Sequence, residues 1–362
     1  MTERQDLPRR PFSIGFLSLL KRAAGARRRG ICIGGYAGCG NLGDDAILQG
    51  YLLGLRSQKN PRPIVVLSGS PRRDSRRFGV RCISRRNPFA ILAAFLRCEE
   101  FLCGGGSLLQ NATGNLSLSY YLFLIRAAHA LGCRPSLLAA GIGPIHGERQ
   151  WARLLSALRL CERVEVRDAD SHRLLLNLGL EQHRLKLVPD PAQALSPPPP
   201  GRLAFLLSEN GISSSTPYFC AILRPTDPNF PLSPLKLSAS LRAFSERSGL
   251  LPVFLVFDPR LDAQITRQIC TRTNGRIIRL REVSDALAIL SGAKLTVALR
   301  FHPLLLSHTV GTPALGISHS IDEQKLESFC RSASFPHLRL PEAGIVSLTL
   351  ALEELIETDS MP

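Results

Sequence analysis

An arginine and a histidine two residues apart carry the clearest chemical signal in this sequence. Leu299-Arg300-Phe301-His302-Pro303 ends a predicted strand, and Pro303 suits the first turn of a following helix. A guanidinium, an imidazole and a helix N-terminus would then converge, which is a combination that binds anions. The plainer alternative is a capped helix with a solvated arginine and a packed histidine. We predict that Arg300 and His302 bind an anion, and that His302 also transfers a proton, because its ordinary pKa of about 6.5 lies near working pH.

A glycine-rich loop with an acidic end is the second candidate. It joins a predicted strand at 31–33 to a predicted helix at 45–55, and it reads Gly-Gly-Tyr-Ala-Gly-Cys-Gly-Asn-Leu-Gly-Asp-Asp from residue 34. Glycines let a ligand approach the backbone closely. The loop lacks the Gly-Lys-Ser/Thr of a phosphate-binding P-loop, and its two carboxylates would oppose a phosphate.

We interpret this loop as a site for a neutral, hydroxyl-rich molecule, with Asp44 or Asp45 as the base. The alternatives are a tight turn between strand and helix, and a carboxylate that only caps the helix. The predicted contacts in the loop are Gly38, Gly40, Asn41 and Gly43.

Further polar residues follow other predicted strands. Gly104-Gly105-Gly106-Ser107 with Gln110 forms a second glycine turn, and Gly141–Pro144 forms a third. Ligands of open parallel sheets bind beyond the carboxyl ends of the strands, so we add Gly105, Gly106, Ser107 and Gln110 to the predicted contacts. Arg167 either pairs with Asp168 or contacts an anion. Lys325, after a strand that ends near residue 317, either extends over the same pocket or is a solvated surface lysine.

Composition limits the partners. The chain has 45 Lys and Arg against 29 Asp and Glu, a net charge of +16 that favours an anionic partner. Aromatic residues make up only 6% and do not alternate with basic ones, so we expect no nucleic acid. None of the ten cysteines forms a Cys-x-x-Cys pair, and we predict no metal site. Such cysteine usage favours a reduced, cytoplasmic protein.

The spacing of apolar segments predicts the architecture. Short apolar strands alternate with helices in both halves of the 362-residue chain, which indicates parallel sheets covered on both faces. We therefore predict an α/β fold of two facing Rossmann-like domains. The proline run at 197–201 separates an N-terminal domain (30–196) from a C-terminal domain (202–362) with a terminal helix, and we expect separate cores.

Residues 1–29 form a predicted basic N-terminal arm, with eight Arg or Lys and two acids. Arg9-Arg10 before the apolar stretch 12–20 faintly resembles a twin-arginine export signal, but basic residues follow that stretch where a cleavage region is small and uncharged. We interpret the segment as an amphipathic arm that can rest on an anionic membrane surface.

Together these motifs resemble the polysaccharide pyruvyl transferase family, in particular its bacterial cell-wall type. The resemblance runs in order from the glycine loop at 35–48 through Gly-Gly-Gly-Ser (104–107), Gly-Ile-Gly-Pro (141–144), Val-Arg-Asp (166–168), Asp-Pro-Ala (190–192) and Leu-Arg-Pro (223–225) to Arg-Phe-His (300–302). It implies a GT-B-like arrangement and transfer of a pyruvyl group from phosphoenolpyruvate to a sugar as a cyclic ketal, with release of phosphate and with no cofactor.

The resemblance also implies roles for single residues. Arg300, His302 and Lys325 match the donor-binding residues, and the C-terminal domain is then the donor side. Asp44 and Asp45 match the acidic end of the glycine loop, on the acceptor side. The implied acceptor is a glycan of a cell-surface polysaccharide or its lipid-linked precursor, which places the protein in the cytoplasm, at the inner face of the membrane. The alternative is a nucleotide-sugar glycosyltransferase of the same architecture.

Overall fold

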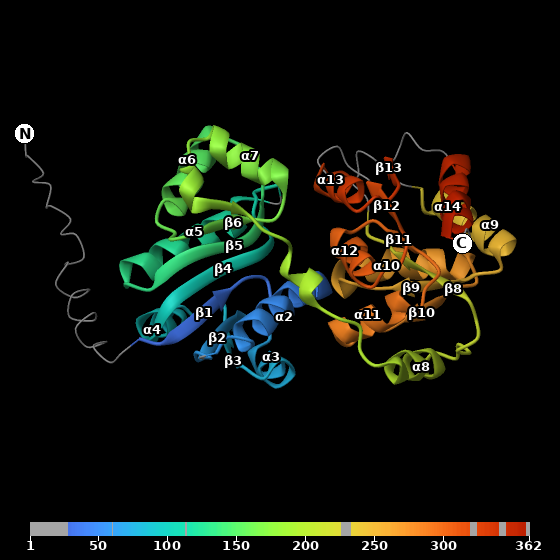
Figure 1. Cartoon of the computed structure of the whole chain (residues 1–362), viewed down its shortest axis with the longest axis horizontal. Coiled ribbons are helices and arrows are strands. Elements are labelled where there is room, and N and C mark those ends of the chain that lie inside the picture. Colours follow the sequence, from blue (N-terminus) through green and yellow to red (C-terminus); the bar gives the residue numbers. More distant parts are fainter. Residues whose placement is uncertain are drawn as a thin grey trace, which may run out of the picture.

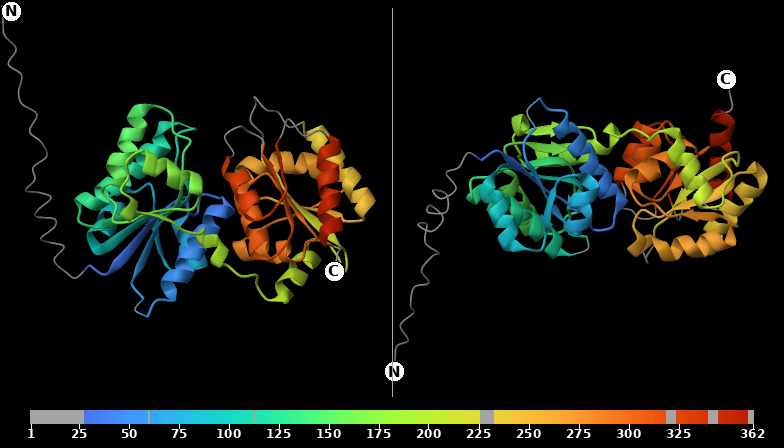
Figure 2. Two further views of the ribbon diagram at one scale, coloured as in Figure 1. Left: turned by 45° about the horizontal axis from the view of Figure 1, so that its top comes forward. Right: turned by 90° about the horizontal axis from the view of Figure 1, so that it is seen from below.

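The structure, a computed structural model, describes residues 28–59, 61–112, 114–225, 233–318, 324–339 and 345–359. These residues form two sheets with helices on both faces of each (Figures 1 and 2). All described strand pairs are parallel. The predicted α/β fold class is therefore confirmed. Residues 1–27 of the predicted basic arm lie outside the described residues.

The N-terminal sheet has seven strands in the order β3-β2-β1-β4-β5-β6-β7. Its strands are β1 (Gly30–Gly34), β2 (Ile64–Ser68), β3 (Arg81–Ser84), β4 (Cys98–Leu109), β5 (Arg134–Ile142), β6 (Val164–Val166) and β7 (Leu185–Leu187). Its helices are α2 (Leu42–Arg56), α3 (Pro71–Phe78), α4 (Pro88–Arg97), α5 (Asn115–Ala130), α6 (Glu148–Leu158) and α7 (Ala169–Asn177). The order reverses beside β1, so the loop after β1 lies at the switch point where such sheets bind ligands.

The C-terminal sheet has six strands in the order β10-β9-β8-β11-β12-β13. Its strands are β8 (Tyr218–Ile222), β9 (Leu251–Leu255), β10 (Arg276–Ile278), β11 (Thr296–Ala298), β12 (Ala314–Ser318) and β13 (His337–Arg339). Its helices are α8 (Pro200–Glu209), α9 (Pro234–Ser248), α10 (Pro259–Arg272), α11 (Val283–Ser291), α12 (Phe301–Thr309), α13 (Gln324–Ser332) and α14 (Ile345–Asp359). No described helix is long and apolar enough to cross a bilayer.

The connection between the sheets differs from the prediction in two ways. Pro200 and Gly201, expected in an extended linker over 197–201, form the first turn of α8. Proline is well tolerated there because the N–H groups of the first helical turn have no partner within the helix. The cores are also not fully separate. Leu42 and Ala46 of α2 pack in one apolar cluster with residues of the C-terminal sheet and its helices, and the Leu42 N–H donates to the Phe257 carbonyl at 2.9 Å.

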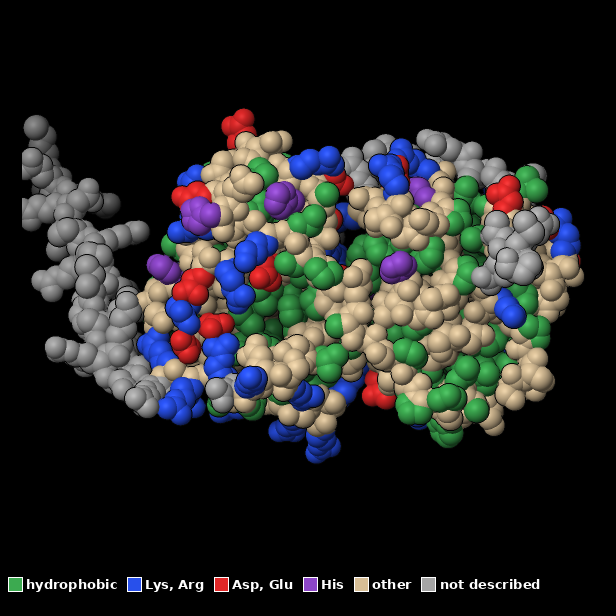
Figure 3. Space-filling model, viewed as in Figure 1, with side chains coloured by type: hydrophobic (Ala, Val, Ile, Leu, Met, Phe, Trp, Pro, Cys, Tyr) green, Lys and Arg blue, Asp and Glu red, His purple; other side chains and the backbone are tan. Residues whose placement is uncertain are grey.

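The basic charge is unevenly distributed. Lys and Arg side chains gather at the lower edge of the N-terminal domain in Figure 3, over α3. This helix has the sequence Pro-Arg-Arg-Asp-Ser-Arg-Arg-Phe. Its last arginine, Arg77, turns inward to the glycine loop.

Candidate active site between the two domains

The glycine loop lets side chains from other segments approach its backbone closely. Gly38 has φ +70, and a Cβ there would lie 1.9 Å from Asp74 Oδ2 and 2.5 Å from Ser68 Oγ. Gly40 has φ +95 and faces the guanidinium of Arg260 in the other domain. Asn41 accepts from the Gly43 N–H at 3.0 Å and so caps α2. The helix is capped by Asn41 and begins at Leu42, which rules out the alternative that Asp44 or Asp45 is the cap.

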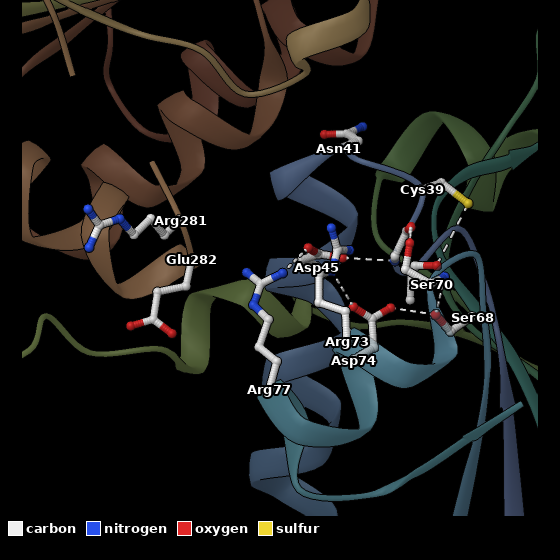
Figure 4. Close-up of polar contacts among 12 residues, drawn as sticks. Cys39, Asn41, Asp45, Ser68, Ser70, Arg73, Asp74, Arg77, Arg281 and Glu282 are labelled. Atoms are coloured by element: carbon white, nitrogen blue, oxygen red, sulfur yellow. Dashed lines mark hydrogen bonds and ion pairs between the residues drawn. The ribbon is translucent and has the colours of Figure 1, made fainter. Parts of the chain in front are cut away.

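The two neighbouring carboxylates have different surroundings. Asp45 is buried, accepts from the Gly38 N–H at 3.1 Å, and forms an ion pair with Arg77 of α3. Figure 4 shows Asp45 beside Arg77, near a second group of contacts among Ser68, Ser70 and Asp74. These bonds fix the loop against α3. The Asp45 carboxylate therefore has a structural role, since both of its oxygens have partners in the loop or in α3.

Asp44 points instead toward the sheet. A Cβ on Gly106 would lie 2.8 Å from Asp44 Oδ1, so the carboxylate rests against the β4 backbone. It lines a pocket with Tyr36, Tyr51 and Gly104, among other residues. Burial raises the pKa of Asp44 to about 7; Arg167 and Arg300 oppose this shift, and nearby carboxylates add to it. The Tyr51 hydroxyl is buried with no hydrogen-bond partner in the described structure.

The second glycine turn and the first half of the third are strand interiors, whereas Gly143 and Pro144 follow the end of β5. Gly104–Gly106 lie within β4, and Gly141 lies within β5, because both strands continue further than their apolar residues indicate. Gly105 and Gly106 have φ +86 and +75, and the pairing with β5 becomes irregular after Gly106. Ser107 is exposed, and Gln110 follows the end of β4, where its side chain accepts from the Ala112 N–H at 2.7 Å.

On the opposite side, Arg300 is the residue before α12, and Asp262 of α10 holds its guanidinium. Arg300 Nε donates to Asp262 Oδ2 at 2.8 Å, and Nη2 donates to Oδ1. Asp262 is fully buried and also accepts from the Asp258 N–H at 3.0 Å. A bidentate pair of this kind fixes the plane of the guanidinium. Asp262 carries no local sequence signal, since it lies 38 residues from its partner.

His302 lies in the first turn of α12 and packs directly on the glycine loop of the other domain. A Cβ on Gly43 would lie 2.2 Å from His302 Nδ1. Its Nε2 is 3.9 Å from Asp190 Oδ2 and has no hydrogen-bond partner in the described structure. Burial lowers the pKa of His302 to about 4, with Asp190 opposing the shift and Arg167 and Arg300 adding to it. The imidazole is therefore neutral at neutral pH.

Arg167 links the two domains. It is buried, and it pairs with Asp190 rather than with Asp168 as one alternative had it. Its guanidinium stacks 4.4 Å from the ring centroid of Phe301, a cation–π contact across the interface. Asp168 instead caps α7 through the Ser171 N–H at 2.7 Å. Asp190 is a site residue that the sequence analysis does not predict; the available signal is its Asp-Pro-Ala motif (190–192), which follows shortly after β7.

Lys325 of α13 reaches across to the N-terminal domain. Its ammonium donates to the Gly143 carbonyl at 3.1 Å and lies 3.5 Å from Ser107 Oγ. Burial lowers the pKa of Lys325 to about 8, while Asp168 opposes that shift. Asp168 Oδ2 is buried without a hydrogen-bond partner in the described structure. The alternative of a solvated surface lysine is therefore wrong.

The structure thus brings Asp44, Arg167, Arg300, His302 and Lys325 to the interface between the domains. Gly43, Gly106 and Ser107 contact members of this group, whereas Asn41 and Asp45 are used in local structure. In the described ranges, no three His, Cys, Asp or Glu side chains are placed to hold a metal ion.

The fold and the site define a two-domain α/β protein of GT-B-like architecture with a polar site at the interface between its domains. UDP-GlcNAc 2-epimerase from Methanocaldococcus jannaschii is similar in structure, with TM-score 0.62 and 11% identity over 90% of this chain and 92% of that one. E. coli ADP-heptose lps heptosyltransferase II gives TM-score 0.53 and 11% identity over 92% and 100%. At such identities the likeness concerns the fold alone.

The family is established from the sequence profile. Residues 41–321 match polysaccharide pyruvyl transferase, and the chain belongs to that family of transferases. No curated protein sequence matches it significantly.

Proposed function

We propose that this protein transfers the pyruvyl group of phosphoenolpyruvate to a sugar as a cyclic ketal and releases phosphate. The observation that carries the proposal is the convergence of Arg167, Arg300, Lys325 and His302 opposite Asp44. Phosphoenolpyruvate has a carboxylate and a phosphate, so its site needs several cations. A sugar acceptor is neutral and needs a base for its hydroxyl.

The residues divide the reaction between the two domains. His302 supplies a proton to C3 of the donor, and C2 then accepts a sugar hydroxyl, whose proton passes to Asp44. The C2–O bond to phosphate breaks, a second hydroxyl of the same sugar takes its place at C2, and the proton of that hydroxyl leaves on the phosphate. The products are the ketal and phosphate. The family match supports a polysaccharide or its precursor as the acceptor.

Phosphoenolpyruvate binding to the full chain with EDTA present is the direct test. We expect saturable heat in titration calorimetry, and a loss of binding in Arg300→Ala. Binding of UDP with no heat from millimolar phosphoenolpyruvate would refute the proposal and favour a nucleotide-sugar glycosyltransferase. Mass spectrometry of glycans from cells with and without the protein would then identify the acceptor.

A further inference from the structure

Two adjacent helices of the N-terminal domain expose large apolar side chains. Phe89 in the first turn of α4 is 82% exposed, and on α5 Leu116 is 89% and Phe123 is 53% exposed. Single exposed apolar residues are ordinary on protein surfaces, whereas a group of them marks a binding site. Leu116, Tyr120 and Phe123 are spaced by four and three residues, so they share one face of α5.

The two helices are arranged so that these side chains form one surface. Both follow parallel strands of the same sheet and pack against each other, so they run in the same direction and begin at the same edge. Phe89 and Leu116 both lie in the first turns. We call the exposed side of these helices, with Phe89, Leu116, Tyr120 and Phe123, the α4–α5 face. In Figure 1 both helices lie on the side of the N-terminal domain away from the C-terminal domain.

The charged side chains that the two helices themselves carry have one sign. Segments 85–97 and 115–130 contain four arginines and no Asp or Glu. These arginines are Arg85, Arg86, Arg97 and Arg126. A two-fold contact between copies would place this face on itself and bring like charges together. An anionic lipid surface accepts both the apolar side chains and the arginines.

The face is continuous with the pocket of Asp44. Tyr36 lines that pocket, and the guanidinium of Arg85 lies 5.0 Å from the ring centroids of both Tyr36 and Tyr120. The Tyr120 hydroxyl also donates to the Arg85 carbonyl at 2.8 Å. A surface in contact with Tyr120 is therefore two side chains from the pocket.

The chain enters the described structure on the same domain. Arg28 donates to the carbonyl of Leu131, directly after α5, at 2.9 Å. Residues 1–27 contain six Lys or Arg and two acids, a composition that suits the same lipid surface.

We infer that the α4–α5 face docks on an anionic lipid bilayer and holds the Asp44 pocket at the membrane surface. This inference concerns where the enzyme works and does not depend on which group it transfers.

Vesicle sedimentation with the full chain tests the inference. Vesicles of phosphatidylglycerol and phosphatidylcholine in equal parts should retain the protein, and pure phosphatidylcholine should retain much less. The double variant Phe89→Gln/Leu116→Gln should bind the mixed vesicles about tenfold or more weakly, since it loses the inserted side chains. The matched control is Leu235→Gln/Leu350→Gln, which changes two residues of the other domain that are 66% and 53% exposed.

Each outcome decides for or against the face. Equal binding of both double variants would overturn the inference and leave the N-terminal arm as the lipid-binding element. A dimer in sedimentation velocity that only Phe89→Gln/Leu116→Gln abolishes would overturn it in favour of self-association. Phosphoenolpyruvate binding by calorimetry should be unchanged in the variant, because neither Phe89 nor Leu116 is among the proposed donor residues, so that failure of the docking and failure of the donor assignment can be told apart.

Discussion

Asp44 and Asp45 are neighbours in the chain, and their replacement by asparagine should have opposite effects on stability. The pKa of Asp44 is raised from 3.8 to about 7 in the folded protein. The folded state therefore holds this proton more tightly than the unfolded state does. The wild type loses stability as the pH rises from about 4 to about 7, and the loss is complete above that range. Asp44→Asn carries no such cost and should be the more stable protein at pH 8.

The size of the effect follows from the shift. A shift of about 3 pKa units, from 3.8 to about 7, corresponds to about 4 kcal/mol at about 1.36 kcal/mol per unit. This is an upper limit, because Asp44 keeps part of its surface in contact with solvent. Asp45→Asn has the reverse sign. It removes the charge that neutralises the largely buried guanidinium of Arg77, a change that costs on the order of 3–5 kcal/mol.

Urea unfolding followed by circular dichroism at pH 5 and pH 8 measures both effects. The stability difference between Asp44→Asn and wild type should grow with pH, while Asp45→Asn should be destabilised at both values. Turnover should be lost in Asp44→Asn, and wild-type kcat/KM should rise as the pH passes about 7, where Asp44 becomes a base. Parallel pH dependence of Asp44→Asn and wild type would refute the assignment of a raised pKa.

Three further predictions concern the interface. His302→Gln should lose about 100-fold or more in turnover with donor affinity nearly kept. Because the pKa of His302 is lowered to about 4 without donor, binding of donor to wild type at pH 6 should take up protons. Calorimetry in buffers of different ionisation heat measures this uptake, and its absence would contradict the prediction. The pKa of Lys325 is lowered to about 8, so donor affinity should fall above pH 8 in wild type but not in Lys325→Arg, and a flat profile in both would remove Lys325 from the donor site. Gly43→Ala should disrupt the site because its methyl group would collide with the His302 ring. Gly54→Ala in the same helix meets no neighbour within 4 Å and should stabilise the folded protein by about 0.5–1 kcal/mol. Equal activity of the two variants in a turnover assay would contradict this packing.

The fold could be predicted from the sequence because its central strands are apolar on both faces. The two strands that the apolar pattern does not reveal are β3 and β13, and each is an edge strand of its sheet. Their sequences, Arg-Cys-Ile-Ser and His-Leu-Arg, are short and partly exposed. An edge strand packs on fewer neighbours, so its sequence needs no apolar run.

The site was only half accessible to sequence reasoning. Motif residues such as Arg300 and His302 follow strands and can be placed at a sheet edge from their position alone. Their partners cannot, because Asp262 and Asp190 lie on other elements and meet them only through the tertiary fold. The sequence alone does not distinguish the two carboxylates of the glycine loop, because the residue that differs between their surroundings, Arg77 on α3, reaches Asp45 only through the tertiary fold.

Burial at the site explains why three groups have displaced pKa values. Burial raises the pKa of Asp44 and lowers those of His302 and Lys325, and in each case it favours the neutral form. His302 lies on Gly43 and Lys325 on Gly143, so contact between the domains produces the burial of these two groups. Asp44 is buried among residues of its own domain. The donor we propose, with its carboxylate and phosphate, would reverse the shift for His302 and Lys325, since its negative charge favours their charged forms. The same charge would also favour the protonated form of Asp44, so in the proposed reaction Asp44 accepts the hydroxyl proton only in its ionised form, above about pH 7.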